Sequence, residues 1–185
     1  MRDTLDRLRS IIAAFLRERQ FPVELYDARD SQSPPQVARF SAVLLAASLH
    51  MRRHEKEMQR FIERERGVLS SLPTAFLSLS LSAAGAHDPA RASEERLQTL
   101  RQLNRCTDEL FEKTRWRPDH TEFVAGALMY TRYNPLVRWI MRRIAQKEGA
   151  STDTSRDHVF TDWGALDRFA EGFASSLAPE LRAAS

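Results

Sequence analysis

Small and hydroxyl-bearing residues stand at the ends of three apolar stretches of this sequence, and they are the first candidates for binding chemistry. Ala47-Ser48 end the first stretch, Ser80 to Ala83 the second, and Gly126-Ala127 the third. Small side chains let a flat ligand approach the main chain, whose amides can hydrogen-bond the ligand's edge. Three such ends together indicate a binding site more strongly than one. For any single end, small residues that simply terminate a strand explain the pattern equally well.

Aromatic and basic residues follow the third end directly. Tyr130, Arg132 and Tyr133 lie just beyond Gly126, and we expect these four residues to contact a substrate. An arginine can neutralise a carboxylate, and a tyrosine ring can stack or donate a hydrogen bond. The structural alternative is a tyrosine-rich turn that packs the following segment onto the protein.

A cationic amphipathic helix is predicted from Leu136 onward. One face can gather apolar residues, namely Leu136, Val137, Ile140, Met141 and Ile144. Arg138, Arg142 and Arg143 supply cations, and Trp139 stands at the flank of the apolar face. Either this helix packs on the domain with a solvated basic side, or it lies on an anionic membrane surface. Both interpretations stay open, because amphipathicity alone does not separate a core face from a membrane face.

Metal chemistry and nucleophilic catalysis have weaker support. His50 and His54 are four residues apart, so they could share a face of the predicted helix, but Arg52, Arg53 and Lys56 crowd that turn and oppose a divalent cation. We therefore expect no metal site. Cys106 falls within a predicted helix and is expected to act as a small, semi-buried residue. Ser78, Ser80 and Ser82 lack the G-x-S-x-G setting of a hydrolase nucleophile.

The elements that must position these residues alternate between helix and strand. Strands are predicted at residues 22–28, 40–47, 75–81 and 121–128, with a return to extended chain at 158–163. Helices are predicted at residues 5–19, from within 48–58, at 94–113, from 136, and at 163–177. Such alternation is typical of an α/β fold with an open, doubly wound parallel sheet and helices on both faces. Residues 1–185 should form a single domain, with a helical insertion at about 129–158 before the last helix.

Composition limits the class of protein and its location. The 185 residues are 42% hydrophobic and 29% charged, which is ordinary for a globular domain. The net charge of +3 is too modest to imply a nucleic-acid partner. A single cysteine excludes an internal disulfide, and no apolar run reaches the ~18 residues of a membrane span. We expect a cytoplasmic protein, and the sequence leaves open whether it forms a homo-oligomer.

Five segments carry a resemblance to a known family. They are ASLHMRRH (47–54), PTAFLSLSL (73–81), TRWRPD (114–119), AGALMYTRY (125–133) and TDTSRDHVFTDW (152–163). In these segments the sequence resembles the menaquinone-dependent protoporphyrinogen oxidase family of the flavodoxin superfamily, in order and over nearly the whole chain. The insertion and the TDT to TDW tail are fairly specific to that family, since a generic flavodoxin lacks the insertion.

The resemblance implies a flavodoxin-like, FMN-binding enzyme of haem biosynthesis. Such an enzyme would oxidise protoporphyrinogen IX to protoporphyrin IX, pass the electrons to menaquinone or ubiquinone, and lie on the inner face of the cell membrane. Two flavin loops are implied: Ala47, Ser48, Leu49 and His50 in one, and Ser78, Leu79, Ser80, Leu81, Ser82 and Ala83 in the other. The insertion, with Arg138, Trp139, Arg142 and Arg143, would form the porphyrinogen, quinone or membrane side. No catalytic proton acceptor can be named.

The sequence departs from the family at its start. Flavodoxins open with a central strand and a loop that holds the FMN phosphate, whereas this sequence starts at MRDTLDRL, inside what should be the first helix. That strand would lie between residues 22–28 and 40–47. Its loss would leave residues 22–28 without a neighbouring strand, with unpaired backbone groups, or would force them to pair directly with residues 40–47. Either the recorded start lies downstream of the true one, which we expect, or the chain is a natural remnant that binds FMN weakly or not at all.

Two further points bear on function. Arg52 stands where relatives commonly place Gly in a flavin loop; its side chain could crowd the flavin or supply a missing cationic contact. The alternative to the oxidase is a flavodoxin-like electron carrier, or a non-catalytic remnant that no longer holds FMN.

Overall fold

A computed structural model describes residues 2–30, 34–128, 130–132, 134–148 and 152–183. The first half of the chain holds α1 (Arg2–Glu18), η1 (Val37–Arg39), β1 (Val43–His50), β2 (Arg53–His54), α2 (Lys56–Leu69), β3 (Thr74–Ser80) and α3 (Ala83–His87). The second half holds α4 (Ser93–Thr114), β4 (His120–Ala125), β5 (Ala127–Leu128), η2 (Tyr130–Arg132), α5 (Pro135–Glu148), β6 (His158–Val159) and α6 (Trp163–Ala183). No helix in these ranges is long and apolar enough to cross a membrane.

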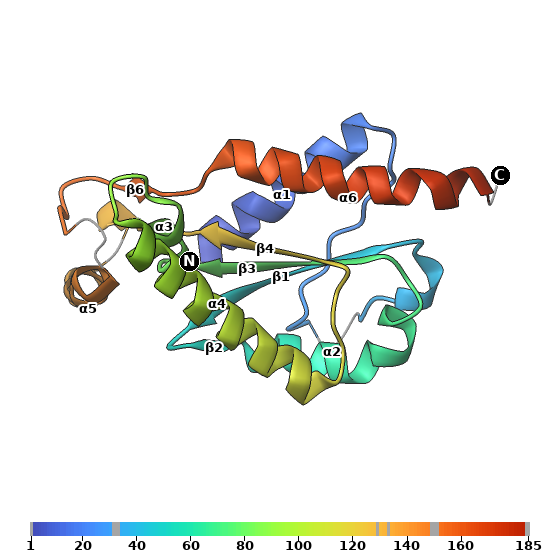
Figure 1. Ribbon diagram of the computed structural model, residues 1–185, viewed down its shortest axis with the longest axis horizontal. Helices are drawn as coiled ribbons and strands as arrows, with labels where there is room; N and C mark the ends of the chain where they lie inside the picture. Colours follow the sequence, from blue (N-terminus) through green and yellow to red (C-terminus); the bar gives the residue numbers. More distant parts are fainter. Residues whose placement is uncertain (1, 31–33, 129, 133, 149–151, 184–185) are drawn as a thin grey trace.

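The central sheet has four strands in the order β2-β1-β3-β4. β1, β3 and β4 run parallel, with Ala47 beside Ser78 and Ser78 beside Phe123. β2 is a short antiparallel strand that pairs with the carboxyl end of β1. Helices α1 and α6 cover one face of the sheet, and α2 and α4 cover the other (Figure 1). This is the open, mostly parallel α/β architecture predicted from the alternation of elements.

The two faces of β3 explain the two main hydrophobic cores. Leu77 and Leu79 join a cluster with α1 and α6, whereas Phe76 joins a cluster with α2 and α4. All seven residues of β3 are buried. An uninterrupted apolar strand of this kind is expected where helices cover both faces of a parallel sheet. The apolar run of β3 was therefore sufficient to predict a fully buried strand, whereas β1 is buried only in part.

The WRPD motif lies at the amino ends of the strands. Trp116 is buried, and its ring packs edge-to-face on Phe111 at 5.9 Å. Asp119 accepts hydrogen bonds from the Thr74 backbone N–H at 2.7 Å and from the Thr74 hydroxyl at 3.3 Å. The motif therefore joins α4, β3 and β4. It is remote from the carboxyl ends, where a ligand is expected.

The strand predicted at residues 22–28 is wrong. These residues belong to no sheet; they run as irregular chain between α1 and η1. Phe21 and Val23 pack on the core beneath α1 and α6, and Ala28 packs on the core beneath α2. Side-chain packing thus holds the segment beside the sheet without a ladder to β1. Residues 22–28 were expected either to remain unpaired or to pair directly with β1, and they remain unpaired.

Two other boundaries also differ from the prediction. His50 and His54 do not share a helix, because Met51 and Arg52 adopt positive φ angles (48° and 64°) and turn the chain back into β2. Two consecutive left-handed residues are the conformation of a tight hairpin. The predicted strand 121–128 is divided at Gly126 into β4 and β5, and β5 pairs with β6 in a separate two-stranded sheet.

Candidate functional site

The three predicted strand ends meet at one edge of the sheet. In the parallel register Ser48 lies beside Leu79, and Ser80 lies beside Ala125. The Gly126 N–H donates to the Ser80 carbonyl at 2.9 Å, which joins the second and third ends directly. The loops after β1, β3 and β4 therefore surround a common edge, as the sequence predicted. We call this edge the carboxyl rim.

Most side chains of the implied flavin loops are buried in the sheet. Ala47, Ser48, Leu49, Ser78, Leu79, Ser80, Leu81 and Ala83 are all buried. His50 is exposed, Ser82 is half-buried, and Met51 is 97% exposed. A ligand at the carboxyl rim would consequently meet the hairpin after β1 and the loop at Ser82, with the buried residues serving as the support beneath them.

The buried polar groups of these loops already have partners. The Ser80 hydroxyl accepts the Ala83 N–H at 3.1 Å and so shapes the turn after β3. The Ser48 N–H donates to the Glu55 carboxylate at 3.4 Å. Both contacts fix the conformation of the loops at the carboxyl rim. The hydroxyl of Ser80 and the carboxylate of Glu55 are thereby engaged within the protein.

His54 is the titratable group most affected by its environment. Its Nε2 lies 3.0 Å from the Ser78 hydroxyl, and its ring packs edge-to-face on Phe76 with the centroids 5.3 Å apart. Burial lowers the pKa of His54 to about 4, so the ring is neutral at pH 7. Its Nδ1 is buried and has no hydrogen-bond partner within the described part of the chain. The sequence marked His54 only as a weak metal candidate, because the hairpin was not foreseen.

The insertion closes at its base by contacts between its two ends. We call residues 127–159, insofar as they are described, the flap. Thr131 donates its backbone N–H and its hydroxyl to Asp157 Oδ1, at 2.9 and 2.8 Å. Thr161 donates its hydroxyl to the carbonyl of Ala125 at 2.8 Å, which ties the end of the flap to β4. Sequence reasoning missed Asp157 and Thr161, although both lie in the segment that carried the family resemblance.

The predicted substrate residues lie in different settings. Gly126 is buried at the junction of β4 and β5. Tyr130 is fully buried; its ring packs edge-to-face on His158 at 6.0 Å, and His158 stacks on Phe160. Arg132 ends η2, and its side chain is outside the described part, as is the whole of Tyr133. Tyr130 thus supports the flap, which is the structural alternative considered for this turn.

Helix α5 presents a mixed aromatic and basic surface. Leu136 and Trp139 are 67% and 61% exposed, and Arg142 and Arg143 are exposed beside them. The Arg143 guanidinium lies over the Trp139 ring, 5.8 Å from its centroid. Arg138 is half-buried and Ala145 is buried, so the opposite side of the helix meets the protein. The side chains of Val137, Ile140, Met141 and Ile144 are not among those described.

The remaining candidates for chemistry are metal-ligating side chains and the lone thiol. Within the described residues no three His, Cys, Asp or Glu side chains gather as metal ligands would. Cys106 is a buried free thiol, and burial raises its pKa, an effect that the positive charge of Arg52 partly offsets. A buried thiol with a raised pKa is a poor nucleophile. The hairpin that carries Arg52 lies against α4.

Several known proteins are similar to this chain in sequence. A protein of Escherichia coli (strain K12) named protoporphyrinogen IX dehydrogenase (quinone) is 29% identical over 165 residues, which cover 89% of this chain and 85% of the relative. A Leishmania major protein of the same name is 30% identical over 152 residues, which cover 82% of this chain and 61% of that protein. These names confirm the resemblance drawn from the sequence. No solved structure matched.

A family model described as a flavodoxin domain matches residues 7–155. That range includes β1, β3, β4 and most of the flap, and hence the carboxyl rim itself. The fold and the match agree over the same elements. The chain therefore belongs to the flavodoxin-domain family.

Proposed function

We propose that this protein is an FMN-dependent dehydrogenase that oxidises protoporphyrinogen IX to protoporphyrin IX and passes the electrons to a quinone. The observation that carries the proposal is the likeness to protoporphyrinogen IX dehydrogenases (quinone) over 89% of the chain. The convergence of three strand ends at the carboxyl rim supports it, because open α/β sheets bind ligands at that edge.

FMN would lie at the carboxyl rim, held by the hairpin after β1 and the loop after β3. The groups present suit the flat ring: the exposed residues His50 and Met51, half-buried Ser82, and small side chains at Ala83 and Ala84. The nearby carboxylate of Glu55 is already engaged by the Ser48 N–H. Bound FMN would supply the two-electron redox chemistry, while the protein orients the reactants and limits the access of water.

The flap would form the substrate side of the site. It leaves the sheet at Gly126 and returns at Thr161, so it begins and ends at the rim where the ring would lie. Arg132 ends η2 in its first turn, and we propose that Arg132 neutralises a propionate of the tetrapyrrole. Tyr130, being fully buried, would position this turn through His158.

Helix α5 would place the protein on the inner face of the cell membrane. Its exposed Leu136 and Trp139, flanked by Arg142 and Arg143, match the apolar and basic groups that bind an anionic lipid surface. A quinone dissolved in that membrane would then reach the carboxyl rim beside the flap. The exposed face of α5 is the feature that supports peripheral attachment.

Purified protein provides a direct test. We expect a yellow protein that releases FMN on heating and that produces porphyrin fluorescence when protoporphyrinogen IX and a quinone are supplied together without oxygen. A yellow protein with no quinone-dependent fluorescence would indicate an electron carrier instead. A protein that stays colourless after addition of FMN would indicate a remnant without the cofactor, and would refute the proposal.

A further inference from the structure

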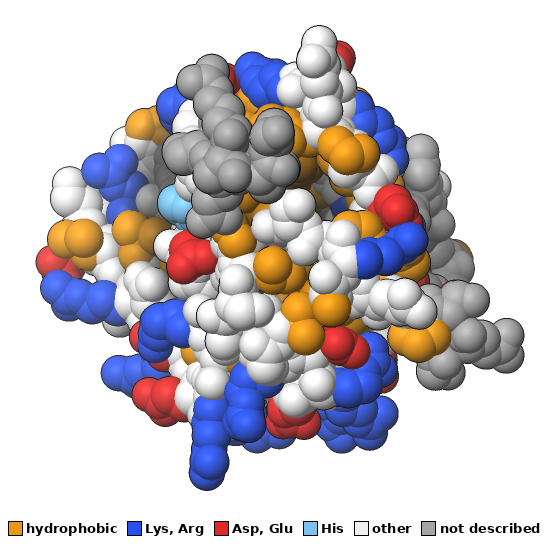
Figure 2. Space-filling view, turned by 90° about the vertical axis from the view of Figure 1, so that its right-hand side faces the viewer, with side chains coloured by type: hydrophobic (Ala, Val, Ile, Leu, Met, Phe, Trp, Pro, Cys, Tyr) orange, Lys and Arg blue, Asp and Glu red, His pale blue; other side chains and the backbone are white. Residues whose placement is uncertain are grey.

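One arginine of the carboxyl rim lies in an unusual setting. At the other end of the molecule, by the amino ends of the strands, Lys and Arg side chains stand among Asp and Glu side chains on an open surface (Figure 2). Arg91 lies instead in the loop between α3 and α4, on the carboxyl rim, and only 25% of its side chain is exposed. A guanidinium that is partly withdrawn from water needs partners that a surface arginine does not.

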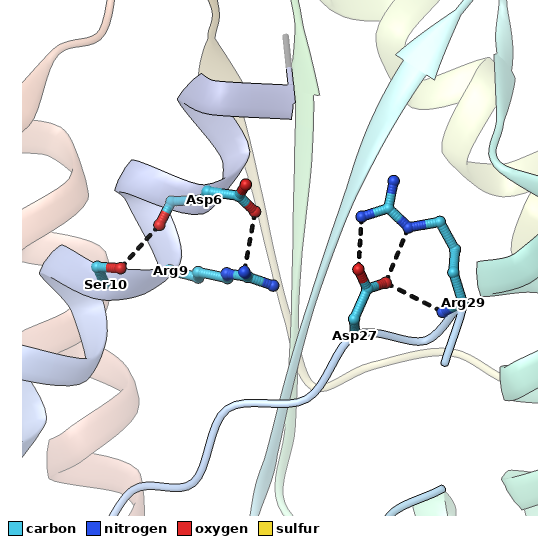
Figure 3. A network of polar contacts seen from close by, with 5 residues as sticks. All are labelled: Asp6, Arg9, Ser10, Asp27 and Arg29. Atoms are coloured by element: carbon cyan, nitrogen blue, oxygen red, sulfur yellow. Dashed lines mark hydrogen bonds and ion pairs between the residues drawn. The ribbon is translucent and has the colours of Figure 1, made fainter. Parts of the chain in front are cut away.

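The carboxylate nearest to Arg91 is farther away than is usual for an ion pair. Arg29, whose side chain is 32% exposed, pairs with Asp27 at 2.6 Å (Figure 3). The Nε of Arg91 is 3.9 Å from Asp88 Oδ2, which is beyond hydrogen-bond distance. The other oxygen of Asp88 accepts the Ala90 N–H at 2.9 Å. Asp88 therefore shapes the loop more than it neutralises Arg91.

The Arg91 side chain packs across Gly85 in α3. A Cβ atom added at Gly85 would lie 2.5 Å from Arg91 Nη1 and 2.8 Å from its Cζ, whereas non-bonded carbon atoms normally stand about 3.5–4 Å apart. The guanidinium therefore occupies the space that a larger residue at position 85 would fill. Gly67 in α2 differs, because a Cβ atom there would meet nothing within 4 Å. The absence of a side chain at Gly85 thus lets Arg91 lie on α3.

A row of aromatic rings leads from α3 to the first turn of the flap. Three alanines of α3 share a hydrophobic cluster with Phe160, where the flap ends. The Phe160 ring stacks on His158 with the centroids 6.1 Å apart, and His158 packs on Tyr130 at 6.0 Å. Tyr130 begins η2, and Arg132 ends it. The row therefore runs from the helix that carries the Arg91 guanidinium to the turn that carries Arg132.

We propose that Arg91 binds one propionate of the tetrapyrrole while Arg132 binds the other, an inference that rests on the proposed function. Protoporphyrinogen IX carries its two propionates on neighbouring pyrrole rings, along one side of the macrocycle. Two arginines at the ends of an aromatic row suit such a ligand, because a guanidinium binds a carboxylate through two parallel hydrogen bonds. Packing on Gly85 also holds Arg91 in place before the ligand arrives, which lowers the entropy lost on binding.

The other ligand expected at the carboxyl rim is FMN. Its ring carries no carboxylate, and its single phosphate is separated from the ring by the ribityl chain. α3 packs against the end of the flap, which is the proposed substrate side. A propionate is therefore the better partner for Arg91, and contact with FMN is an outcome that the experiment below distinguishes.

The test compares the binding of protoporphyrin IX with the binding of its dimethyl ester to the purified protein with FMN added. The ester keeps the macrocycle and lacks both carboxylates, and fluorescence titration in one mild detergent gives both dissociation constants. We expect the parent protein to prefer the diacid. Arg91→Gln should weaken diacid binding about tenfold and change ester binding by less than about twofold. Arg91→Lys should retain part of the affinity, because it keeps the charge without the bidentate geometry.

Gly85→Ala displaces the guanidinium while leaving Arg91 itself unchanged. It should weaken diacid binding several-fold and leave ester binding as in the parent. Gly67→Ala is the matched control and should change neither dissociation constant. Urea unfolding should give similar midpoints for both glycine variants and the parent, since only the end of a flexible side chain has to move at Gly85.

The division of the two propionates is tested by combining Arg91→Gln with Arg132→Gln. The two losses of diacid affinity should multiply if the arginines bind different carboxylates. A double variant that binds no more weakly than either single variant would contradict that division.

Three results would overturn the role of Arg91. The first is unchanged diacid binding in Arg91→Gln, and the second is an equal loss for diacid and ester. The third is a tenfold loss of FMN affinity with diacid binding intact, which would assign Arg91 to the cofactor. If the parent protein binds neither porphyrin, the proposed substrate is wrong as well. A parent that prefers the diacid whether or not Arg91 is present refutes this inference alone.

Discussion

The carboxylate of Asp157 holds Thr131 through two hydrogen bonds, one from the backbone N–H at 2.9 Å and one from the hydroxyl at 2.8 Å. The two residues are 26 positions apart in the sequence and lie at the two ends of the flap. Together with the β5–β6 pairing, this contact closes the flap at its base. This carboxylate therefore helps to hold the turn that carries Arg132, together with the packing of Tyr130 on His158.

Replacing this carboxylate should loosen the flap without unfolding the sheet. We expect Asp157→Ala to lower the free energy of unfolding by only about 1–2 kcal/mol, because two hydrogen bonds are lost at an exposed site. Cleavage by trypsin within α5 should become several-fold faster. Asp153→Ala is the matched control, since the carboxylate of Asp153 serves a local turn at Ser155. Equal trypsin sensitivity in the two variants would contradict this role of Asp157.

His54 should make stability depend on pH. Burial holds the pKa of His54 at about 4 in the folded protein, below about 6.5 in an unfolded chain. At a pH between these two pKa values, His54 is protonated in the unfolded chain and neutral in the folded protein. Stability should therefore be full above about pH 6.5 and fall by about 2–3 kcal/mol as the pH drops toward 4.

Urea unfolding between pH 4 and 7.5 measures this effect. His54→Gln should flatten that part of the profile, whatever it costs in stability at pH 7. His50→Gln, on the exposed side of the same hairpin, should leave the profile of the parent protein intact. A profile that is unaltered by His54→Gln would assign the pH dependence to other groups.

Asp119 should matter for stability more than the exposed ion pair of Arg117, its neighbour in the motif. Asp119→Ala leaves the buried Thr74 N–H without its carboxylate partner, which should cost about 1–3 kcal/mol in thermal or urea unfolding. Asp108→Ala removes an exposed ion pair with Arg117 at 2.8 Å and should cost less than about 1 kcal/mol. Similar losses in both variants would contradict the structural role given to WRPD.

The exposed face of α5 should govern membrane binding. Arg142→Gln with Arg143→Gln should weaken binding to vesicles of anionic phospholipid about tenfold or more, since each basic group near the surface contributes about 1 kcal/mol. Arg64→Gln with Arg101→Gln removes the same charge from exposed sites on α2 and α4. Vesicle sedimentation should separate the two double variants. Equal binding would mean that net charge alone, and not α5, attracts the lipid.

The sequence predicted the parallel strands and the rim because those features follow from local patterns. Apolar runs marked β1 and β3, and helical periodicity marked α1, α4 and α6. It failed at residues 22–28, where an extended apolar pattern is held by packing rather than by a ladder. It also missed the turn at Met51 and Arg52, since neither residue is the Gly or Asn that usually signals positive φ.

Side-chain partnerships were beyond the reach of sequence patterns. Ser78 was predicted as a flavin-loop residue, but the parallel register buries it and places its hydroxyl on His54, 24 residues away. Asp157 and Thr131 meet only because β5 and β6 pair. Contacts between distant residues depend on register, which periodicity does not reveal.

The most direct measurement of the central claim is the anaerobic, quinone-dependent appearance of porphyrin fluorescence from protoporphyrinogen IX. We expect fluorescence to rise with the purified protein, FMN and a quinone present together, and to stay near the background when the quinone or the protein is omitted. Arg132→Ala should raise the apparent KM for the porphyrinogen. If the protein binds FMN but porphyrin fluorescence rises no faster with the protein than without it, the assignment as a dehydrogenase is contradicted.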